Sequence, residues 1–320
     1  MNKLISNLYI KLFGLLPSFL NKFISKIFKK LFDLHQLSSY QNNFLCELNI
    51  YGTKFKLYLL GKDHQAQSVY RKLHKTDQVY ELQMVKILKS IIDTKKFKTF
   101  LDVGSFMGYF SCYAASIDKN LKVYSIESNK HYCQFIQKSL KQNSISNVNI
   151  FNEILSKNQT EMFFHKEGVY FSNENKKFEM KKSITLDSLC KINSIIPEII
   201  KIDVHGAEGL VLNGSHNILK NDCKIILLEL HSNEYLKKFS DGDNRTSIVN
   251  FLLKNKFSCF LISHHRDSSG IKNFNNGKKL EINEQNVEQI LFDRETVDLL
   301  IFAIKKDLNI NSFDYFSKSL

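Results

Sequence analysis

The 320-residue sequence has only two prolines, little arginine and no closely spaced cysteine pairs. Its six cysteines show no paired short spacing, which excludes a disulfide scaffold and a cysteine-based zinc site. Several of them lie in apolar segments, where free thiols behave as small hydrophobic side chains. Because unpaired thiols suit a reducing environment, we expect a cytoplasmic protein.

A net charge of +13 raises nucleic acid as a partner, but the distribution of the charge argues against it. Lysines are spread along the whole chain, and asparagine, isoleucine and phenylalanine are also abundant. A general compositional bias therefore explains much of the excess of lysine. We expect no specific nucleic-acid partner.

Residues 1–40 form a basic segment with the pattern of an amphipathic helix, and Pro17 suits its first turn. Between residues 17 and 32, apolar side chains recur at helical spacing opposite a lysine-rich face, which is typical of a helix on an anionic membrane surface. Lysine interrupts the pattern too often for a membrane span, and no small-residue cleavage site follows. We expect attachment to the inner face of the membrane; packing on protein is the alternative.

The stretch FLDVGSFMGYF, residues 100–110, reads as a buried strand that breaks into a glycine turn and opens a helix. Such a turn leaves backbone N–H groups pointing at a nucleotide-like ligand. The spacing differs from G-x-G-x-x-G, which argues against NAD. Asp102, just before the first glycine, suits a ligand with a positive centre, such as S-adenosylmethionine; the alternative is a turn without a ligand. The expected cradle residues are Asp102, Gly104, Ser105, Phe106 and Gly108.

The next strand, KVYSIE, ends in Glu127 about twenty residues after the turn, the offset at which such folds place a carboxylate on a ribose. We expect Glu127 to contact the ribose, with Ser128 beside it; capping of the following helix is the alternative. Glu153, at the end of the third strand, is expected near the adenine, or else as a solvated loop acid.

Two later strands end in acids and histidines. PEIIKID ends in Asp203 and is followed by His205 and Glu208, and KIILLELH ends in Glu229 and His231. The carboxyl ends of parallel strands meet at one edge of a sheet, so we expect these groups to lie close together.

Five blocks resemble, in this order, the FkbM-type methyltransferases, which use S-adenosylmethionine: FLDVGSFMGYF, VYSIE, ITLDSL (residues 184–189), IIKIDVHGAEGLVLNG (residues 199–214) and LLELH. The resemblance covers roughly residues 98–231. It implies a class I methyltransferase fold, S-adenosylmethionine as cofactor, and methylation of a hydroxyl group on a sugar, a glycan or another small molecule. One position departs from the family pattern: His205 stands where the family usually has Glu or Gln.

The alternation of strand and helix after residue 97 predicts an α/β, Rossmann-like fold, with a seven-stranded, mostly parallel sheet and helices on both faces. We divide the chain into an N-terminal helical segment at 1–40, a hairpin and helix at 41–96, a cofactor-binding domain at 97–307 and a tail at 308–320. The expected strands are 98–103, 122–127, 148–153, 199–203, 224–230, 257–262 and 297–303, with a small hairpin inserted after the third.

Methyl transfer to an alcohol is an in-line displacement in which a base must take the hydroxyl proton. We favour Asp203 as the base, assisted by His205 or His231, because Asp203 ends the strand beside the cofactor turn. The alternative is that Asp203 and Glu208 only organise the turn and cap a helix. No ligand spacing specifies a metal site, so we assign none.

Two other classes of function stay open: a non-catalytic membrane-associated scaffold that keeps the fold and, less favoured, an NAD-dependent oxidoreductase. Methylation of nucleic-acid amino groups is not expected, because Pro17 and Pro197 form no Asn-Pro-Pro-Tyr loop. Neither the acceptor nor the oligomeric state follows from the sequence.

Overall fold

The computed structural model describes residues 43–61, 63, 66–70, 79–165, 168–170, 179–239, 242–262, 279–292 and 298–308. The chain divides into a small unit, residues 1–44 and 59–67, and a large unit, residues 45–58 and 68–320. In the small unit, the Asp63 carboxylate accepts the Ala66 N–H and the Gln67 side chain donates to the Gly61 carbonyl. The expected amphipathic helix at 17–32 lies outside the described residues, and the domain boundaries stay predictions.

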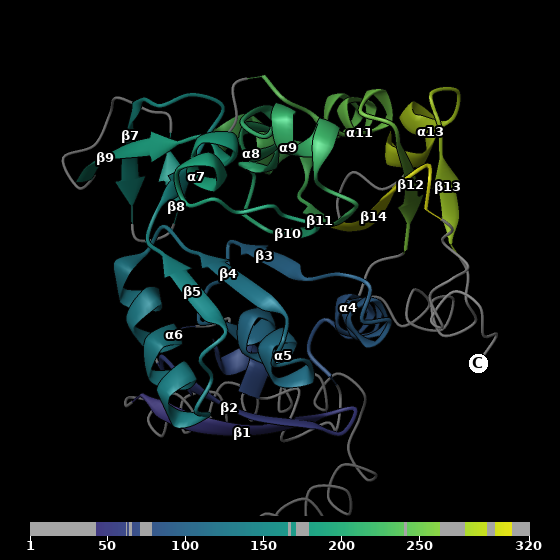
Figure 1. Ribbon diagram of the computed structural model, residues 1–320. Coiled ribbons are helices and arrows are strands. Elements are labelled where there is room, and N and C mark those ends of the chain that lie inside the picture. Colours follow the sequence, from purple (N-terminus) through teal and green to yellow (C-terminus); the bar gives the residue numbers. More distant parts are fainter. Residues whose placement is uncertain are drawn as a thin grey trace, which may run out of the picture. The chain divides into compact units, whose positions relative to one another are not determined.

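The large unit is built on an eight-stranded sheet (Figure 1) with the order β13-β12-β14-β11-β10-β3-β4-β5. Five strands of this sheet, β3, β4, β5, β10 and β11, run parallel, while β14 is antiparallel to both β11 and β12. The expected mostly parallel sheet is therefore confirmed, with one strand more than the seven predicted. The strands are β3 (Thr99–Val103), β4 (Lys122–Ile126), β5 (Val148–Phe151), β10 (Ile199–Ile202), β11 (Ile225–Leu230), β12 (Phe257–Leu261), β13 (Leu280–Ile282) and β14 (Leu299–Lys305).

The additional strand is β13, which pairs with β12 at the edge of the sheet. It is only three residues long, and two of them are exposed. Three residues are too few to show an alternating apolar pattern in the sequence. The conformation of β13 is instead decided by its backbone pairing with β12.

The strand order reverses between β3 and β10. From β3 the chain adds β4 and β5 on one side, and it later returns to add β10 and β11 on the other. In open α/β sheets, ligands bind at the carboxyl ends of the strands where the order reverses. This edge is where the predicted site residues gather.

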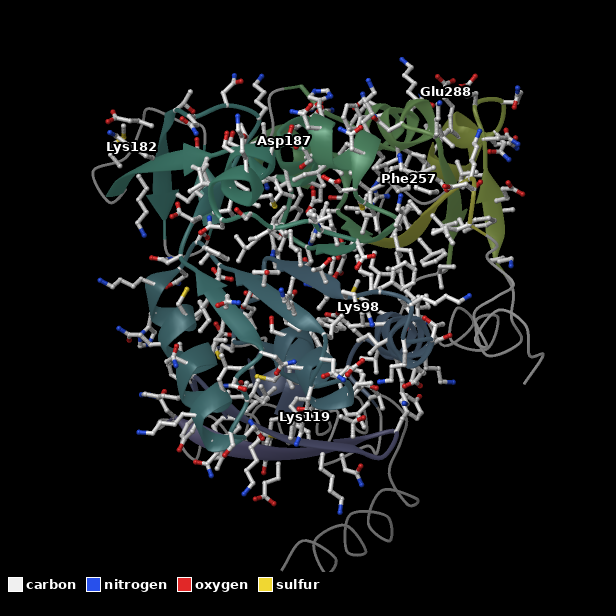
Figure 2. All side chains as sticks on the ribbon, in the orientation of Figure 1. Lys98, Lys119, Lys182, Asp187, Phe257 and Glu288 are labelled. Atoms are coloured by element: carbon white, nitrogen blue, oxygen red, sulfur yellow. The ribbon has the colours of Figure 1, made fainter. Side chains whose placement is uncertain are left out.

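The sheet is buried on both faces, as its apolar strands require. Every residue of β3, β10, β11 and β14 is buried. Figure 2 shows charged side chains such as Lys182 and Glu288 at the periphery, whereas Phe257 lies inside and is fully buried.

Helices cover both faces of the sheet (Figure 1), with α4, α5 and α6 on one face and α7, α8, α9, α11 and α13 on the other. Their apolar sides pack on the strands, as in the 12-residue α4, where seven residues are buried. The helices are α4 (Leu82–Asp93), α5 (Tyr109–Ile117), α6 (Lys130–Gln142), α7 (Leu186–Ile192), α8 (Glu208–Asn213), α9 (His216–Asn221), α10 (Asn233–Phe239), α11 (Arg245–Lys254) and α13 (Val287–Phe292).

The expected hairpin before the main sheet is present as β1 (Phe44–Ile50) and β2 (Thr53–Leu59). Its two-residue turn, Tyr51-Gly52, has positive φ at both positions, as a tight hairpin turn requires. Asn143, at the end of α6, holds β2 by accepting the Lys56 N–H and donating to the Lys56 carbonyl, both at 2.7 Å.

A second, four-stranded sheet is inserted after β5, where the sequence predicts a small hairpin. Its order is β6-β9-β7-β8, from β6 (Ile154–Leu155), β7 (Glu161–His165), β8 (Gly168–Tyr170) and β9 (Glu179–Ile184). The β7–β8 pair is the expected hairpin.

Among the helices of the described ranges, none is long and apolar enough to cross a membrane.

Candidate functional site

The glycine turn after β3 packs directly on the end of β10. The N–H groups of Gly104 and Ser105 both donate to the Ile126 carbonyl, which ties the turn to β4. Gly104 has φ +74°, and a Cβ at this position would collide with the backbone carbonyl of Asp203. Glycine is therefore required here both for its backbone conformation and for the close approach of two strand ends.

Glu127 follows β4 and holds the middle of the turn. Its carboxylate accepts the N–H groups of Phe106 and Asn129, each at 2.8 Å and each on a different oxygen, and the Ser128 hydroxyl at 3.4 Å. Burial raises the pKa of Glu127 to about 7, against hydrogen bonds that lower it. Helix capping and ribose binding are compatible here, since a carboxylate has about four acceptor positions.

Asp102 is completely buried, and its carboxylate contacts protein groups. The Ser111 hydroxyl donates to it at 2.6 Å, and the Lys201 ammonium lies 3.5 Å from its other oxygen. Burial raises the pKa of Asp102, and Lys201 opposes the rise. Its expected contact with the positive end of the cofactor stays a prediction.

Lys201, which the sequence reasoning missed, lies at the centre of the site with 3% of its side chain exposed. Its Nζ is 3.3 Å from Asp203 Oδ2, 3.4 Å from the Gly104 carbonyl and 5.1 Å from the centre of the Phe110 ring. The lysine joins the two acids that end β3 and β10. The available signal was a lysine inside the apolar run IIKI, since lysine is almost never fully buried unless it is paired.

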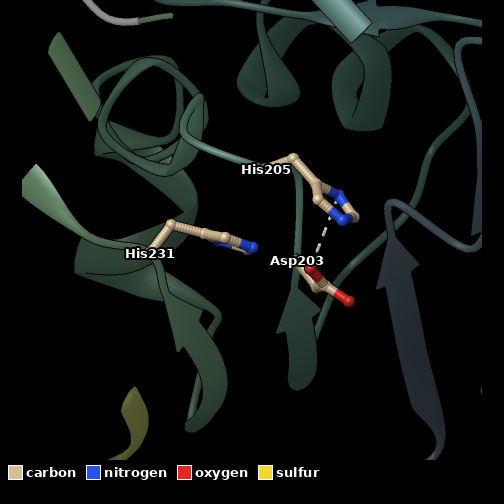
Figure 3. Close-up of side chains that lie close together, drawn as sticks. All are labelled: Asp203, His205 and His231. Atoms are coloured by element: carbon tan, nitrogen blue, oxygen red, sulfur yellow. Dashed lines mark ion pairs between the residues drawn. The ribbon is translucent and has the colours of Figure 1, made fainter. Parts of the chain in front are cut away.

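Asp203, His205 and His231 lie together at the sheet edge, as predicted (Figure 3). His205 Nδ1 is 4.0 Å from Asp203 Oδ1, and the two histidine rings are 4.8 Å apart between centroids. His205 has a φ of 51°, in the left-handed region, and 46% of its side chain is exposed, against 6% for His231. Of the two imidazoles, His205 is thus the accessible one.

His231 is held by Glu208, the first residue of α8. The Glu208 carboxylate is fully buried and accepts the Gly206 N–H at 3.0 Å and His231 Nδ1 at 2.9 Å. Burial alone lowers the pKa of His231, but Glu208 raises it to about 10, so the ring is an imidazolium at neutral pH. For Asp203, burial raises the pKa, but Lys201, followed by His205 and His231, holds it well below its usual range.

A group of three carboxylates adjoins these histidines. Oxygens of Glu81, Asp203 and Glu229 lie within 4.8 Å of one another. Oxygen donors of this kind suit a hard cation. The ammonium of Lys201 and the imidazolium of His231 lie nearby but pair with Asp102, Asp203 Oδ2 and Glu208, and we assign no metal to the three carboxylates.

Glu153 follows β5 and is partly exposed. Because β4 and β5 are parallel neighbours, it lies at the same sheet edge as Glu127. Burial raises its pKa, and no hydrogen bond within the described ranges fixes its carboxylate. Its place near the adenine stays a prediction.

A family model described as the methyltransferase FkbM domain matches residues 102–267, just over half of the chain. No curated protein matches the sequence. One similar solved structure is a SAM-dependent methyltransferase from Agrobacterium tumefaciens, at 11% identity and TM-score 0.44, covering 82% of this chain and 70% of that one. Another is an O-methyltransferase from Bacillus cereus in complex with SAH, at 13% identity and TM-score 0.42, covering 76% and 88%. These structural likenesses are weak; the family match and the sheet described above confirm the expected class I methyltransferase fold.

Proposed function

The chain belongs to the FkbM methyltransferase family, whose cofactor is S-adenosylmethionine, and we propose that it methylates a hydroxyl group of a sugar, a glycan or another small molecule. The observation that carries the proposal is the position of Asp203, His205 and His231 at the sheet edge that also bears the glycine turn. This arrangement supports a proton acceptor beside the expected cofactor cradle.

The reaction needs one proton acceptor and an aligned oxygen. Bound S-adenosylmethionine would supply the methyl group from its sulfonium centre to the hydroxyl oxygen, with the neutral thioether as the leaving group. The hydroxyl proton passes to a base within hydrogen-bond reach during the attack.

We assign different roles to the three candidate groups. Asp203 is a weak base, because the ion pair with Lys201 keeps its pKa low. His231 already carries a proton shared with Glu208. His205 is therefore the group that takes the proton, and Asp203 orients its ring. This modifies the sequence-based preference for Asp203 as the base with a histidine assisting.

Cofactor binding separates the classes of function. Calorimetry on the full chain with S-adenosylmethionine, S-adenosylhomocysteine and NAD should show binding of the first two alone. Binding of NAD without S-adenosylmethionine would overturn the proposal in favour of an oxidoreductase. Binding of none of the three would favour a scaffold that keeps the fold.

The acceptor is found by screening sugars and lipid-linked glycans for transfer of a labelled methyl group. Once the acceptor is known, Asp203→Asn should lower kcat for it, because the amide no longer orients the imidazolium that forms on His205. An Asp203→Asn variant that binds cofactor and turns over at the full rate contradicts this role.

Chemical rescue distinguishes the two histidines. His205→Ala should lose most of its activity and regain part of it with added imidazole, because its site is open to solvent. His231→Ala is the matched control and should not respond, because its side chain is 6% exposed. Rescue of His231→Ala instead would exchange the two roles.

We further propose a cytoplasmic protein that residues 17–32 attach to an anionic membrane surface. The support is the phenylalanine-rich stripe opposite a lysine face in the sequence. Deletion of residues 1–35 should abolish binding to anionic vesicles and leave binding to neutral vesicles unchanged. Equal binding by the full chain and the deletion variant would favour packing of this segment on protein.

A further inference from the structure

Three carboxyl groups from three separate elements meet beside the glycine turn. Glu81 precedes α4, Asp203 follows β10 and Glu229 lies near the end of β11, with oxygens within 4.8 Å of one another. Like charges held this closely repel, so the arrangement is costly unless a cation or a proton joins them.

Two of these carboxyl groups have hydrogen-bonding capacity that is not used. Glu229 is 5% exposed, yet its carboxyl group makes no hydrogen bond within the described part of the chain. Asp203 Oδ1 is also buried and receives no hydrogen bond from the residues that the structure describes. Burial, followed by Asp203 and Glu81, raises the pKa of Glu229 well above its usual range. Buried polar groups are normally satisfied, so both acceptors indicate a missing donor.

The position of Glu81 is well defined. The residue caps α4 in a left-handed conformation with φ 48°, but its side chain does not accept a hydrogen bond from that helix. The preceding residue is fixed as well, because the Tyr109 hydroxyl donates to the Tyr80 carbonyl at 3.0 Å. A non-glycine residue in this region of φ/ψ is strained, and such strain is concentrated at functional sites.

The nearby cations already have other partners. Lys201 lies between Asp102 and Asp203 Oδ2, and His231 pairs with Glu208. Neither therefore donates a hydrogen bond to Glu229. Asp102 is fully buried and its carboxylate already contacts the Ser111 hydroxyl and the Lys201 ammonium, so we do not include it in the group.

We propose that Glu81, Asp203 and Glu229 together receive the α-ammonium group of the amino-acid end of the cofactor. An ammonium group has three N–H donors, which matches three carboxyl acceptors. Glu127 lies on the β4 side of the turn, whereas the three carboxyl groups lie on the β10 and β11 side. A ligand laid across the turn thus has its ribose on one side and its amino-acid end on the other. The inference rests on the proposed function, because it assumes this class of cofactor.

The test compares two ligands that share the adenosine end. S-adenosylhomocysteine carries the ammonium group, and methylthioadenosine lacks the amino-acid end. Glu229→Gln and Glu81→Gln in the full chain should each weaken S-adenosylhomocysteine binding about tenfold and leave methylthioadenosine binding unchanged. Glu234→Gln is the control, since its side chain is 78% exposed and pairs with Lys238 on the same helix.

Unchanged methylthioadenosine binding also shows that each variant is folded. If the unmodified chain binds both ligands and neither variant separates them, the ammonium site is wrong while the proposed function stands. If the unmodified chain binds neither ligand, the proposed function itself fails. Titration with Mg²⁺ alone is the third arm: binding that Glu229→Gln abolishes, with S-adenosylhomocysteine affinity unaffected, would replace the ammonium site by a metal site.

Discussion

Glu208 Oε1 lies 2.9 Å from His231 Nδ1, and this buried ion pair connects the start of α8 to the end of β11. The same Glu208 oxygen accepts the Gly206 N–H, so it also holds the turn that carries His205. One carboxylate thus positions both histidines of the site. Removing its charge should affect stability as well as chemistry.

Glu208→Gln should lower the free energy of unfolding by about 3 kcal/mol at pH 7, because it leaves a buried imidazole without its anion. The folded-state pKa of His231, about 10, lies above its ordinary 6.5. The pair therefore contributes fully below pH 6.5, and its contribution is lost as pH rises toward 10. Urea unfolding between pH 6 and 10 should show the loss from this pair in the unmodified protein and not in Glu208→Gln.

The control for this prediction is Glu234→Gln. Glu234 and Lys238 form an exposed pair one helical turn apart on α10. Such pairs contribute less than about 0.5 kcal/mol, so this variant should unfold like the unmodified protein at every pH. Equal decreases in the free energy of unfolding for Glu208→Gln and Glu234→Gln would mean that the buried pair contributes no more to stability than the exposed one.

Gly104→Ala should destabilise the protein far more than Gly52→Ala. Both glycines have positive φ, +74° and +81°, so alanine meets a similar backbone penalty of about 1 kcal/mol at each. A Cβ at Gly52 meets no atom of the described residues within 4 Å, whereas at Gly104 it collides with the Asp203 carbonyl. Thermal unfolding of the two variants should differ by a further 1–3 kcal/mol or so, the usual cost of overpacking. Equal effects would contradict the contact between β3 and β10.

Lys201→Met should cost about 3–5 kcal/mol at pH 7, because it removes the cation shared by two buried carboxylates. Lys201 lowers the pKa of Asp203, so its contribution is present above the ordinary value of 3.8 and is lost as pH falls toward the depressed folded-state value. The variant should therefore approach the unmodified protein in stability as Asp102 and Asp203 become protonated. Lys238→Met, at an exposed position, is the control. A deficit that stays constant as pH falls from 5 to 2 would contradict the pairing.

The parts of the fold that the sequence predicts well are those with a local cause. β3 and its turn follow from an apolar run that ends at Asp102-x-Gly104, and the sheet-edge location of Glu127 follows from its offset. Likewise Asp203 and His231 end two parallel strands, and parallel strands end at one edge. Each of these inferences uses only neighbours in the chain and one rule about sheets.

The contacts that were not predicted join residues distant in sequence. Lys201 on β10 reaches Asp102 on the neighbouring strand β3, and Glu208 at the start of α8 contacts His231 after β11. The same holds for Glu81, which precedes α4 and which the fold brings close to Asp203. No local pattern encodes these pairs, because they depend on how the helices and strands pack.

Glu127→Gln should weaken binding at the adenosine end of the cofactor. Its two carboxylate oxygens accept the N–H groups of Phe106 and Asn129, and a glutamine has only one acceptor oxygen. One N–H group would then face the amide NH₂, and the ribose would lose a charged acceptor. We expect methylthioadenosine and S-adenosylhomocysteine to lose affinity equally, about tenfold, unlike the selective loss expected for Glu229→Gln.

The pH dependence of methylthioadenosine binding gives this prediction a second measurement. Burial raises the pKa of Glu127 to about 7, so below that pH the carboxyl group is protonated and accepts hydrogen bonds from the ribose less well. The affinity of the unmodified protein, measured by calorimetry, should therefore fall as pH decreases from 8 to 6. The Glu127→Gln variant has no charge to lose at this position and should show a flat profile over the same range. An equally steep profile in both proteins would assign the titration to another group and remove Glu127 from the ribose site.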